Sequence, residues 1–194
     1  MASIALFHSV LGVRPGITDA ADRLRAAGHE VLVVDQYGGR VFDDYAEAGA
    51  HVDAVGFPAL MQLALDAFGE LPDGFVAAGF SNGAGMAEYV ATQRRCAGAL
   101  LVSGALPVAM LGAGAWPAGT PVQLHYGERD PHRVQEWVDG FLADVRGSGG
   151  EVEFVEHPVA GHLFTDPSLP AEHDAAATEV LWERALAFCA RVAG

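Results

Sequence analysis

Short apolar runs alternate along the whole chain with segments of helical periodicity, and this alternation limits the folds open to the sequence. The runs occupy 4–7, 31–34, 75–78, 99–102, 122–126 and 152–155. The run at 4–7 has no alternating polar residues, which is typical of a strand buried on both faces of a sheet. Strands that alternate with helices indicate a parallel sheet covered on both sides. We therefore expect an α/β fold with about six mostly parallel strands, in a single domain over residues 1–194.

Between these runs, apolar residues recur three and four positions apart, as on the buried face of a helix. Helices are expected near 17–27, 58–68, 83–94, 134–145 and 174–192. In the fourth of these helices one side would carry Val134, Trp137, Val138, Phe141 and Val145. The segment 106–119 is rich in Ala, Gly and Pro and is expected to form an irregular loop. Whether this loop acts as a lid stays open.

Composition excludes several classes of protein. All 11 basic residues are arginine. Schiff-base and pyridoxal-phosphate enzymes, Ser-Lys hydrolases and P-loop NTPases each need a lysine amine, so none of these can be built here. The net charge of −14 argues against nucleic acid and anionic membranes as partners.

The cysteines and the apolar segments indicate the cellular compartment of the protein. Cys96 and Cys189 form neither a C-x-x-C motif nor a disulfide framework. No run of 18 apolar residues could span a bilayer, and residues 1–16 lack the basic start of a secretory signal. These features predict a cytoplasmic protein.

One motif indicates nucleophilic catalysis. Gly79-Phe80-Ser81-Asn82-Gly83 matches G-x-S-x-G, directly after an expected strand and before an expected helix. In a nucleophile elbow the serine sits on a strained strand-to-helix turn, and small flanking residues prevent collisions within that turn. With 24 glycines and six serines in the chain, about 0.1 matches would arise by chance. Ser81 is therefore the candidate nucleophile.

A serine nucleophile needs a base, and the base needs an orienting acid. His162 lies in a loop after the sixth expected strand, and Asp130 follows the fifth. The order Ser81, Asp130, His162 is that of α/β-hydrolases. Asp130 could also cap the helix after Pro131, and Asp166 is the next candidate for the acid.

A metal site is the rival interpretation of the segment after the fifth strand. Its ligands would be His125, Glu128, Asp130 and His132. Their spacing matches none of the recognised zinc patterns, so we expect no metal and no organic cofactor.

The chain resembles the dienelactone hydrolase family of α/β-hydrolases over nearly its whole length. The matching segments, in order, are HSVLG (8–12), DQYGG (35–39), GFSNG (79–83), YGERDP (126–131), GHLF (161–164), DP (166–167) and WER (182–184). The resemblance implies a compact α/β-hydrolase in which Ser81, Asp130 and His162 are catalytic. It also implies an oxyanion hole formed by the backbone N–H groups of Val10 and Asn82.

The sequence departs from the family pattern at three positions. Dienelactone hydrolases carry a cysteine nucleophile and a glutamate after the first strand, where this chain has Ser81 and Ser9. The two differences are consistent, because a serine activated by histidine has no use for a thiol-tuning carboxylate. The family's substrate-binding arginine four residues past the histidine is Asp166 here, which argues against an anionic substrate.

These observations predict a serine hydrolase that cleaves a small carboxylic ester, lactone or thioester through an acyl-enzyme. Candidate substrate-binding residues are Ser9, Tyr37, Arg40 and Trp116. A solvated side chain is the favoured role of Arg40, and packing against the sheet is an equally simple role for Trp116. The protein is expected to be a monomer or a homodimer. The alternatives are a non-catalytic small-molecule-binding protein that retains the fold, and a peptidase, which the short chain disfavours.

Overall fold

The six apolar runs form one parallel sheet. The computed structural model describes residues 1–67 and 71–193. The strands occur in the spatial order β2-β1-β3-β4-β5-β6, and every neighbouring pair is parallel. Their bounds are β1 Ser3–Phe7, β2 Glu30–Val34, β3 Phe75–Phe80, β4 Cys96–Val102, β5 Val122–Gly127 and β6 Val152–His157. The expected α/β fold with six parallel strands is confirmed.

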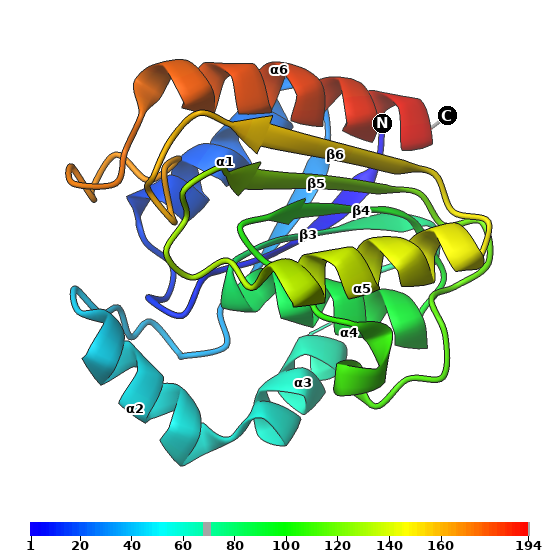
Figure 1. Cartoon of the computed structure of the whole chain (residues 1–194), viewed down its shortest axis with the longest axis horizontal. Helices are drawn as coiled ribbons and strands as arrows, with labels where there is room; N and C mark the ends of the chain where they lie inside the picture. Colours follow the sequence, from blue (N-terminus) through cyan, green and yellow to red (C-terminus); the bar gives the residue numbers. More distant parts are fainter. Residues whose placement is uncertain (68–70, 194) are drawn as a thin grey trace.

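Helices cover both faces of the sheet, so alternate side chains of a central strand enter different cores. In β1, Ile4 and Leu6 pack with α1 (Pro15–Ala26) and α6 (Ala175–Val192). Ala5 and Phe7 pack on the other face with α4 (Asn82–Gln93) and α5 (Gln135–Gly147). Figure 1 shows α1 and α6 on one side of the sheet and α4 and α5 on the other. This two-sided burial explains why the central strands β1, β3 and β4 read as continuous apolar runs.

Two helices lie between β2 and β3, where the sequence predicted one. Helix α3 (Phe57–Asp66) corresponds to the helix expected at 58–68, of which Phe68 is outside the described residues. Helix α2 (Tyr45–Val55) was not predicted. It buries only Ala48 and Val52, so its sequence carries little apolar periodicity.

The start of α2 is stabilised by a capping side chain. The Asp44 carboxylate accepts hydrogen bonds from the N–H groups of Ala46 and Glu47. Gly56 separates α2 from α3 with a φ of 85°, a conformation that favours glycine.

The buried side of α5 is narrower than predicted. Val138, Phe141 and Val145 are fully buried, as expected. Val134 precedes the helix as its N-cap, and Trp137 is 38% exposed, so the prediction was wrong for these two residues. Trp137 instead lines a cavity at the end of the sheet, described below.

The segment 106–119 is irregular apart from a 3-10 turn, η1 (Val108–Leu111). Trp116 is buried there, packs edge-on against Phe141 and donates a hydrogen bond to the Thr120 carbonyl. This tryptophan is therefore part of the core.

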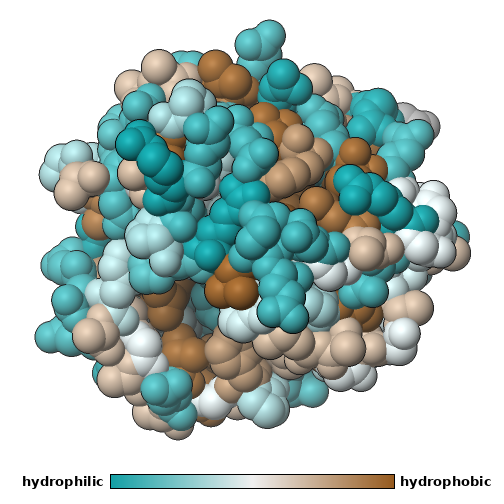
Figure 2. Space-filling view, in the orientation of Figure 1, coloured by the Kyte–Doolittle hydropathy of each residue, from teal (hydrophilic) through white to brown (hydrophobic). Residues whose placement is uncertain are grey.

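The surface carries several exposed apolar side chains. On the face in Figure 2 they form separate patches among hydrophilic residues. None of the described helices is long and apolar enough to cross a membrane.

Two buried histidines form a pair between neighbouring strands. The His125 Nδ1 of β5 lies 3.0 Å from the His157 Nε2 of β6, and the His125 Nε2 lies 3.0 Å from the Gln123 Oε1. Burial, with smaller effects of His157 and Arg184, lowers the pKa of His125 to about 3. Burial also lowers the pKa of His157. The folded protein therefore holds both rings neutral.

We predict that acid destabilises the fold through this pair. The unfolded chain protonates histidine near pH 6.5, so below that pH it binds more protons than the folded chain. The contribution of this pair to the free energy of unfolding is fully present above about pH 6.5 and is lost as the pH falls toward 3. Between about pH 7.5 and pH 5, His125 alone should reduce the free energy of unfolding by about 2 kcal/mol, measured by urea denaturation.

The variant His125→Gln isolates this contribution. Its free energy of unfolding should depend less on pH than that of the native chain, whatever its absolute stability. His173→Gln, on the loop before α6, should keep the native pH dependence. An unchanged pH dependence in His125→Gln would refute the assignment.

Candidate active site

Ser81 occupies a strained turn between β3 and α4. Its φ of 54° and ψ of −117° are unusual for a residue other than glycine. A Cβ on Gly79 would collide with the Gly83 carbonyl, and a Cβ on Gly83 would collide with the carbonyl groups of Phe7 and His8. The two glycines of the motif are thus required by close backbone contacts, as the motif predicted.

The loops after β5 and β6 bring two further side chains to Ser81. The His162 Nε2 lies 2.7 Å from the Ser81 Oγ, and the His162 Nδ1 lies 2.7 Å from the Asp130 Oδ2. His162 and Asp130 are both buried. A carboxylate at Nδ1 keeps the proton on that nitrogen, so Nε2 is free to accept the proton of the serine hydroxyl. The structure therefore brings together the three residues that the sequence selected.

Asp130 uses its second oxygen to order its own loop. The Oδ1 accepts the N–H of His132 at 2.8 Å. Helix α5 begins only at Gln135, so Asp130 does not cap it, and that alternative is wrong. Both oxygens of the carboxylate are occupied, which fixes its orientation toward His162.

Ser103, at the end of β4, supports the histidine loop, and the sequence analysis missed it. Its hydroxyl donates to the His162 carbonyl at 2.6 Å, and its N–H donates to the His125 carbonyl. Like Ser81, Ser103 has a φ of 54°. Only the position of this buried serine at a strand end could have indicated the role.

Glu172 connects the histidine loop to α2. Its Oε2 accepts the Leu163 N–H at 2.6 Å, and its Oε1 accepts the Tyr45 hydroxyl at 2.9 Å. Burial and this hydrogen bond raise the pKa of Tyr45, so the hydroxyl stays protonated. The Tyr45 ring lies 6.2 Å from the His162 ring. Helix α2 is thereby fixed beside the candidate site.

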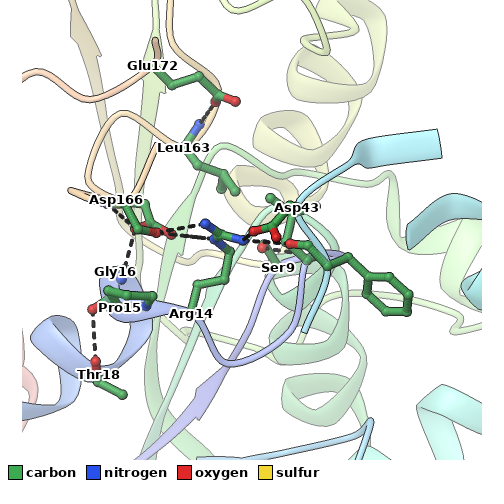
Figure 3. Close-up of polar contacts among 12 residues, drawn as sticks. Ser9, Arg14, Pro15, Gly16, Thr18, Asp43, Leu163, Asp166 and Glu172 are labelled. Carbon is green, nitrogen blue, oxygen red and sulfur yellow. Dashed lines mark hydrogen bonds and ion pairs between the residues drawn. The ribbon is translucent and has the colours of Figure 1, made fainter. Parts of the chain in front are cut away.

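Arg14 ties three loops together behind the site. Its Nε lies 3.5 Å from the Asp166 Oδ2, and its Nη1 donates to the Asp43 Oδ1 and to the Phe42 carbonyl, each at 2.6 Å. Asp166 also accepts the N–H of Gly16 at 3.1 Å. Figure 3 shows the Arg14 guanidinium between Asp166 and Asp43.

Asp166 is therefore engaged by Arg14 rather than by His162. Both of the side chains are buried, at 6% exposure for Asp166 and 8% for Arg14. The Ser168 N–H and hydroxyl also donate to the Asp166 Oδ1. Asp166 was the second candidate for the acid, and the structure pairs His162 with Asp130 instead.

A cavity of about 250 Å³ opens beside Ser81 at the carboxyl ends of the strands, where ligands of parallel sheets bind. Its lining is mainly apolar and aromatic. It consists of Val10, Tyr45, Phe57, Ser81, Asn82, Gly85, Ser103, Gly104, Ala105, Leu106, Tyr126, His132, Trp137 and His162. Val10 and Asn82, the expected oxyanion-hole residues, both belong to this lining. Asn82 is the first residue of α4, so its N–H has no partner within the helix.

The expected substrate-binding residues occupy other places. Among the described residues, the cavity lining does not include Ser9, Tyr37, Arg40 or Trp116. The Ser9 hydroxyl accepts the Leu11 N–H, and Arg40 lies exposed near His51. Tyr37 packs against the rings of His8 and His51, and burial raises its pKa to about 12. These residues shape the loops around the site but do not face the cavity.

The cavity instead draws on residues from segments that gave little signal in the sequence. Tyr45 and Phe57 are the first residues of α2 and α3, Trp137 lies in the first turn of α5, and His132 precedes that helix. The His132 ring lies 4.7 Å from the His162 ring and 5.3 Å from the Tyr45 ring. The sequence analysis had considered His132 only as a ligand of the rival metal site.

The four residues of the rival metal site do not converge. His125 contacts His157 and Gln123, whereas Asp130 contacts His162. Across residues 1–67 and 71–193, no group of three or more His, Cys, Asp or Glu side chains is arranged to hold a metal ion.

A nucleophile elbow after a central strand, with an acid and a histidine after later strands, defines the α/β-hydrolase class. The model of the Dienelactone hydrolase family matches residues 1–193. The chain therefore belongs to the dienelactone hydrolase family, whose activity is hydrolytic and directed at small molecules.

Solved structures agree with this fold. The chain is similar to a dienelactone hydrolase-like promiscuous phosphotriesterase from metagenomic libraries, with a TM-score of 0.79 and 21% identity, covering 99% of this chain and 87% of that one. It is also similar to a dienelactone hydrolase from Anabaena variabilis, with a TM-score of 0.66 and 18% identity, covering 95% and 84% of the two chains.

One curated relative matches a smaller part of this chain. An uncharacterized protein of Caenorhabditis elegans is 32% identical over 73 residues, which is 34% of this chain and 46% of that protein. The match therefore spans less than half of that protein's length.

We predict that Arg14 is essential to the order of these loops. Arg14→Met would leave Asp166 buried without its cation, and breaking a buried pair in this way costs about 3–5 kcal/mol. The free energy of unfolding, from urea denaturation, should fall by that amount.

Arg25→Met is the matched control, because Arg25 pairs with Asp22 at the surface. It should lower stability by less than about 1 kcal/mol. Equal losses in the two variants would contradict the importance of the Arg14 contacts.

Proposed function

We propose that the protein is a serine hydrolase that cleaves a small carboxylic ester, lactone or thioester. The observation that carries this proposal is the continuous hydrogen-bonded series from Ser81 through His162 to Asp130, with 2.7 Å at each step. Ser81 and His162 line a cavity of about 250 Å³. A hydrogen-bonded series of this kind is the arrangement that activates a serine hydroxyl.

The mechanism has two halves. The Ser81 Oγ attacks the substrate carbonyl carbon while the His162 Nε2 takes the hydroxyl proton. Collapse of the tetrahedral intermediate breaks the bond to the leaving group, which receives the proton from His162. Water, deprotonated in turn by His162, then attacks the acyl-enzyme. The bond between the acyl carbon and the Ser81 Oγ breaks, His162 returns the proton to the Oγ, and the acid is released. Asp130 holds the ring in position and stabilises its protonated form.

The negative oxygen of each intermediate would be bound by the backbone N–H groups of Val10 and Asn82. Asn82 begins α4, so the positive end of the helix dipole reinforces its N–H. A donor aimed at a developing oxyanion contributes about 3–4 kcal/mol to transition-state stabilisation. The proposed reaction needs no metal or organic cofactor.

A non-catalytic binding protein with the same fold is the competing proposal. The strained backbone at Ser81 argues against it, because a conformation of this kind costs about 1–3 kcal/mol and persists where function requires it. A protein that only bound its ligand would gain nothing from a serine held in this way.

We predict that Asp130→Asn retains the fold and lowers kcat for an activated ester about 10⁴-fold, because the amide favours the wrong tautomer of His162. Steady-state hydrolysis of p-nitrophenyl acetate by the native chain and the variant measures the effect. Near-native kcat in Asp130→Asn would mean that another group orients the histidine.

A further inference from the structure

The lining of the cavity beside Ser81 contains two chemically different groups of residues. Tyr45 and His132 lie beside His162, with ring distances of 6.2 and 4.7 Å to the His162 ring. Phe57, Leu106 and Trp137 are the large apolar residues of the lining and together are called the apolar wall. Tyr45 and His132 are aromatic side chains with polar atoms. The side chains of the apolar wall have no hydrogen-bond acceptor and only one donor, the indole N–H of Trp137.

One residue of the apolar wall, Leu106, is held by α4. Leu106 packs over Gly85 of this helix, where an added Cβ would lie 3.1 Å from the Leu106 Cδ1. The Leu106 N–H donates to both carboxyl oxygens of Glu88, at 3.1 and 3.2 Å. Glu88 lies two turns after Ser81 on α4 and is fully buried. It therefore fixes Leu106 relative to the nucleophile.

The chemistry of acyl transfer assigns these two groups of residues to the two parts of the substrate. His162 must deliver its proton to the leaving-group oxygen, so the leaving group has to lie next to the imidazole. The region of Tyr45 and His132 consequently receives the alcohol or thiol. The acyl group, on the other side of the carbonyl carbon, then faces the apolar wall.

The lining also carries no fixed charge. None of the residues that form it is arginine, aspartate or glutamate, within the described part of the chain. The nearby Arg133 is paired with Glu156 and lies over the rings of Tyr126 and Phe154. A substrate carboxylate would therefore lose its hydration without gaining a cation, which is strongly unfavourable.

Building on the proposed function, we infer that the substrate is an uncharged ester or thioester with a small apolar acyl group. The acyl group packs against Phe57, Gly85, Leu106 and Trp137, and the leaving group lies against Tyr45 and His132. The cavity of about 250 Å³ is smaller than the pockets of roughly 300–1,000 Å³ that bind drug-sized ligands, which favours a short acyl group.

A matched pair of esters tests the charge of the substrate. One is the mono-p-nitrophenyl ester of glutaric acid, and the other is the same compound with its free carboxylate methylated. We expect kcat/KM to be at least about tenfold higher for the neutral compound, because only the anion must be desolvated. Trp137→Arg should reduce this ratio at least about threefold by supplying a cation at the mouth.

The size of the acyl subsite is tested with p-nitrophenyl esters from acetate to decanoate. Leu106→Ala and Phe57→Ala should move the optimum kcat/KM toward longer chains, because each removes part of the wall. Leu63→Ala is the matched control, since Leu63 is also an exposed apolar residue of α3 but is not in the cavity lining. It should leave the optimum unchanged.

The outcomes separate this inference from the proposed function. Suppose that p-nitrophenyl acetate is hydrolysed by the native chain and not by Ser81→Ala, and that the anionic glutarate ester is turned over as fast as the neutral one or faster. This result would overturn the inference of a neutral substrate but would support the proposed serine hydrolase. An unchanged chain-length optimum in both wall variants would overturn the acyl subsite. Failure to hydrolyse any of the esters would refute both.

Discussion

The backbone between β3 and α4 determines how the rest of the site is arranged. Ser81 has a φ of 54°, and the chain can enter α4 directly after it only because Gly79 and Gly83 bring no side chain to the turn. The Ser81 N–H donates to the Val102 carbonyl of β4, so the sheet itself anchors the strained residue. The hydroxyl is thereby presented above the sheet, where only the loops that follow other strands can reach it.

Those loops are held by polar contacts in addition to the apolar packing of Leu163 and Phe164. Ser103 binds the His162 carbonyl, Glu172 binds the Leu163 N–H, and Asp166 with Arg14 fixes the segment that follows. Such contacts are directional, so they define the position of His162 more narrowly than apolar packing would. A rigid support of this kind is what a proton-transfer group within hydrogen-bonding distance of its partners requires.

The sequence predicted the central strands β1, β3 and β4 well because two-sided burial leaves a continuous run of apolar residues. It also selected Ser81 by its motif, and Asp130 and His162 by their positions in the loops after β5 and β6. Helix α2 was missed because it buries few side chains, and a solvated helix has a weak apolar period. The cavity lining was predicted poorly for a different reason. Trp116 lies in an apolar loop segment and Trp137 on an amphipathic helix, and only the tertiary structure decides which of the two faces the cavity.

The central claim is that the strained turn presents an activated serine. The most direct test is the intact-protein mass after treatment with a fluorophosphonate, which reacts with activated serine hydroxyls, for the native chain and for Ser81→Ala. We expect a single adduct on the native protein and none on the variant. A folded native protein that forms no adduct, or an adduct that persists in Ser81→Ala, would contradict the claim.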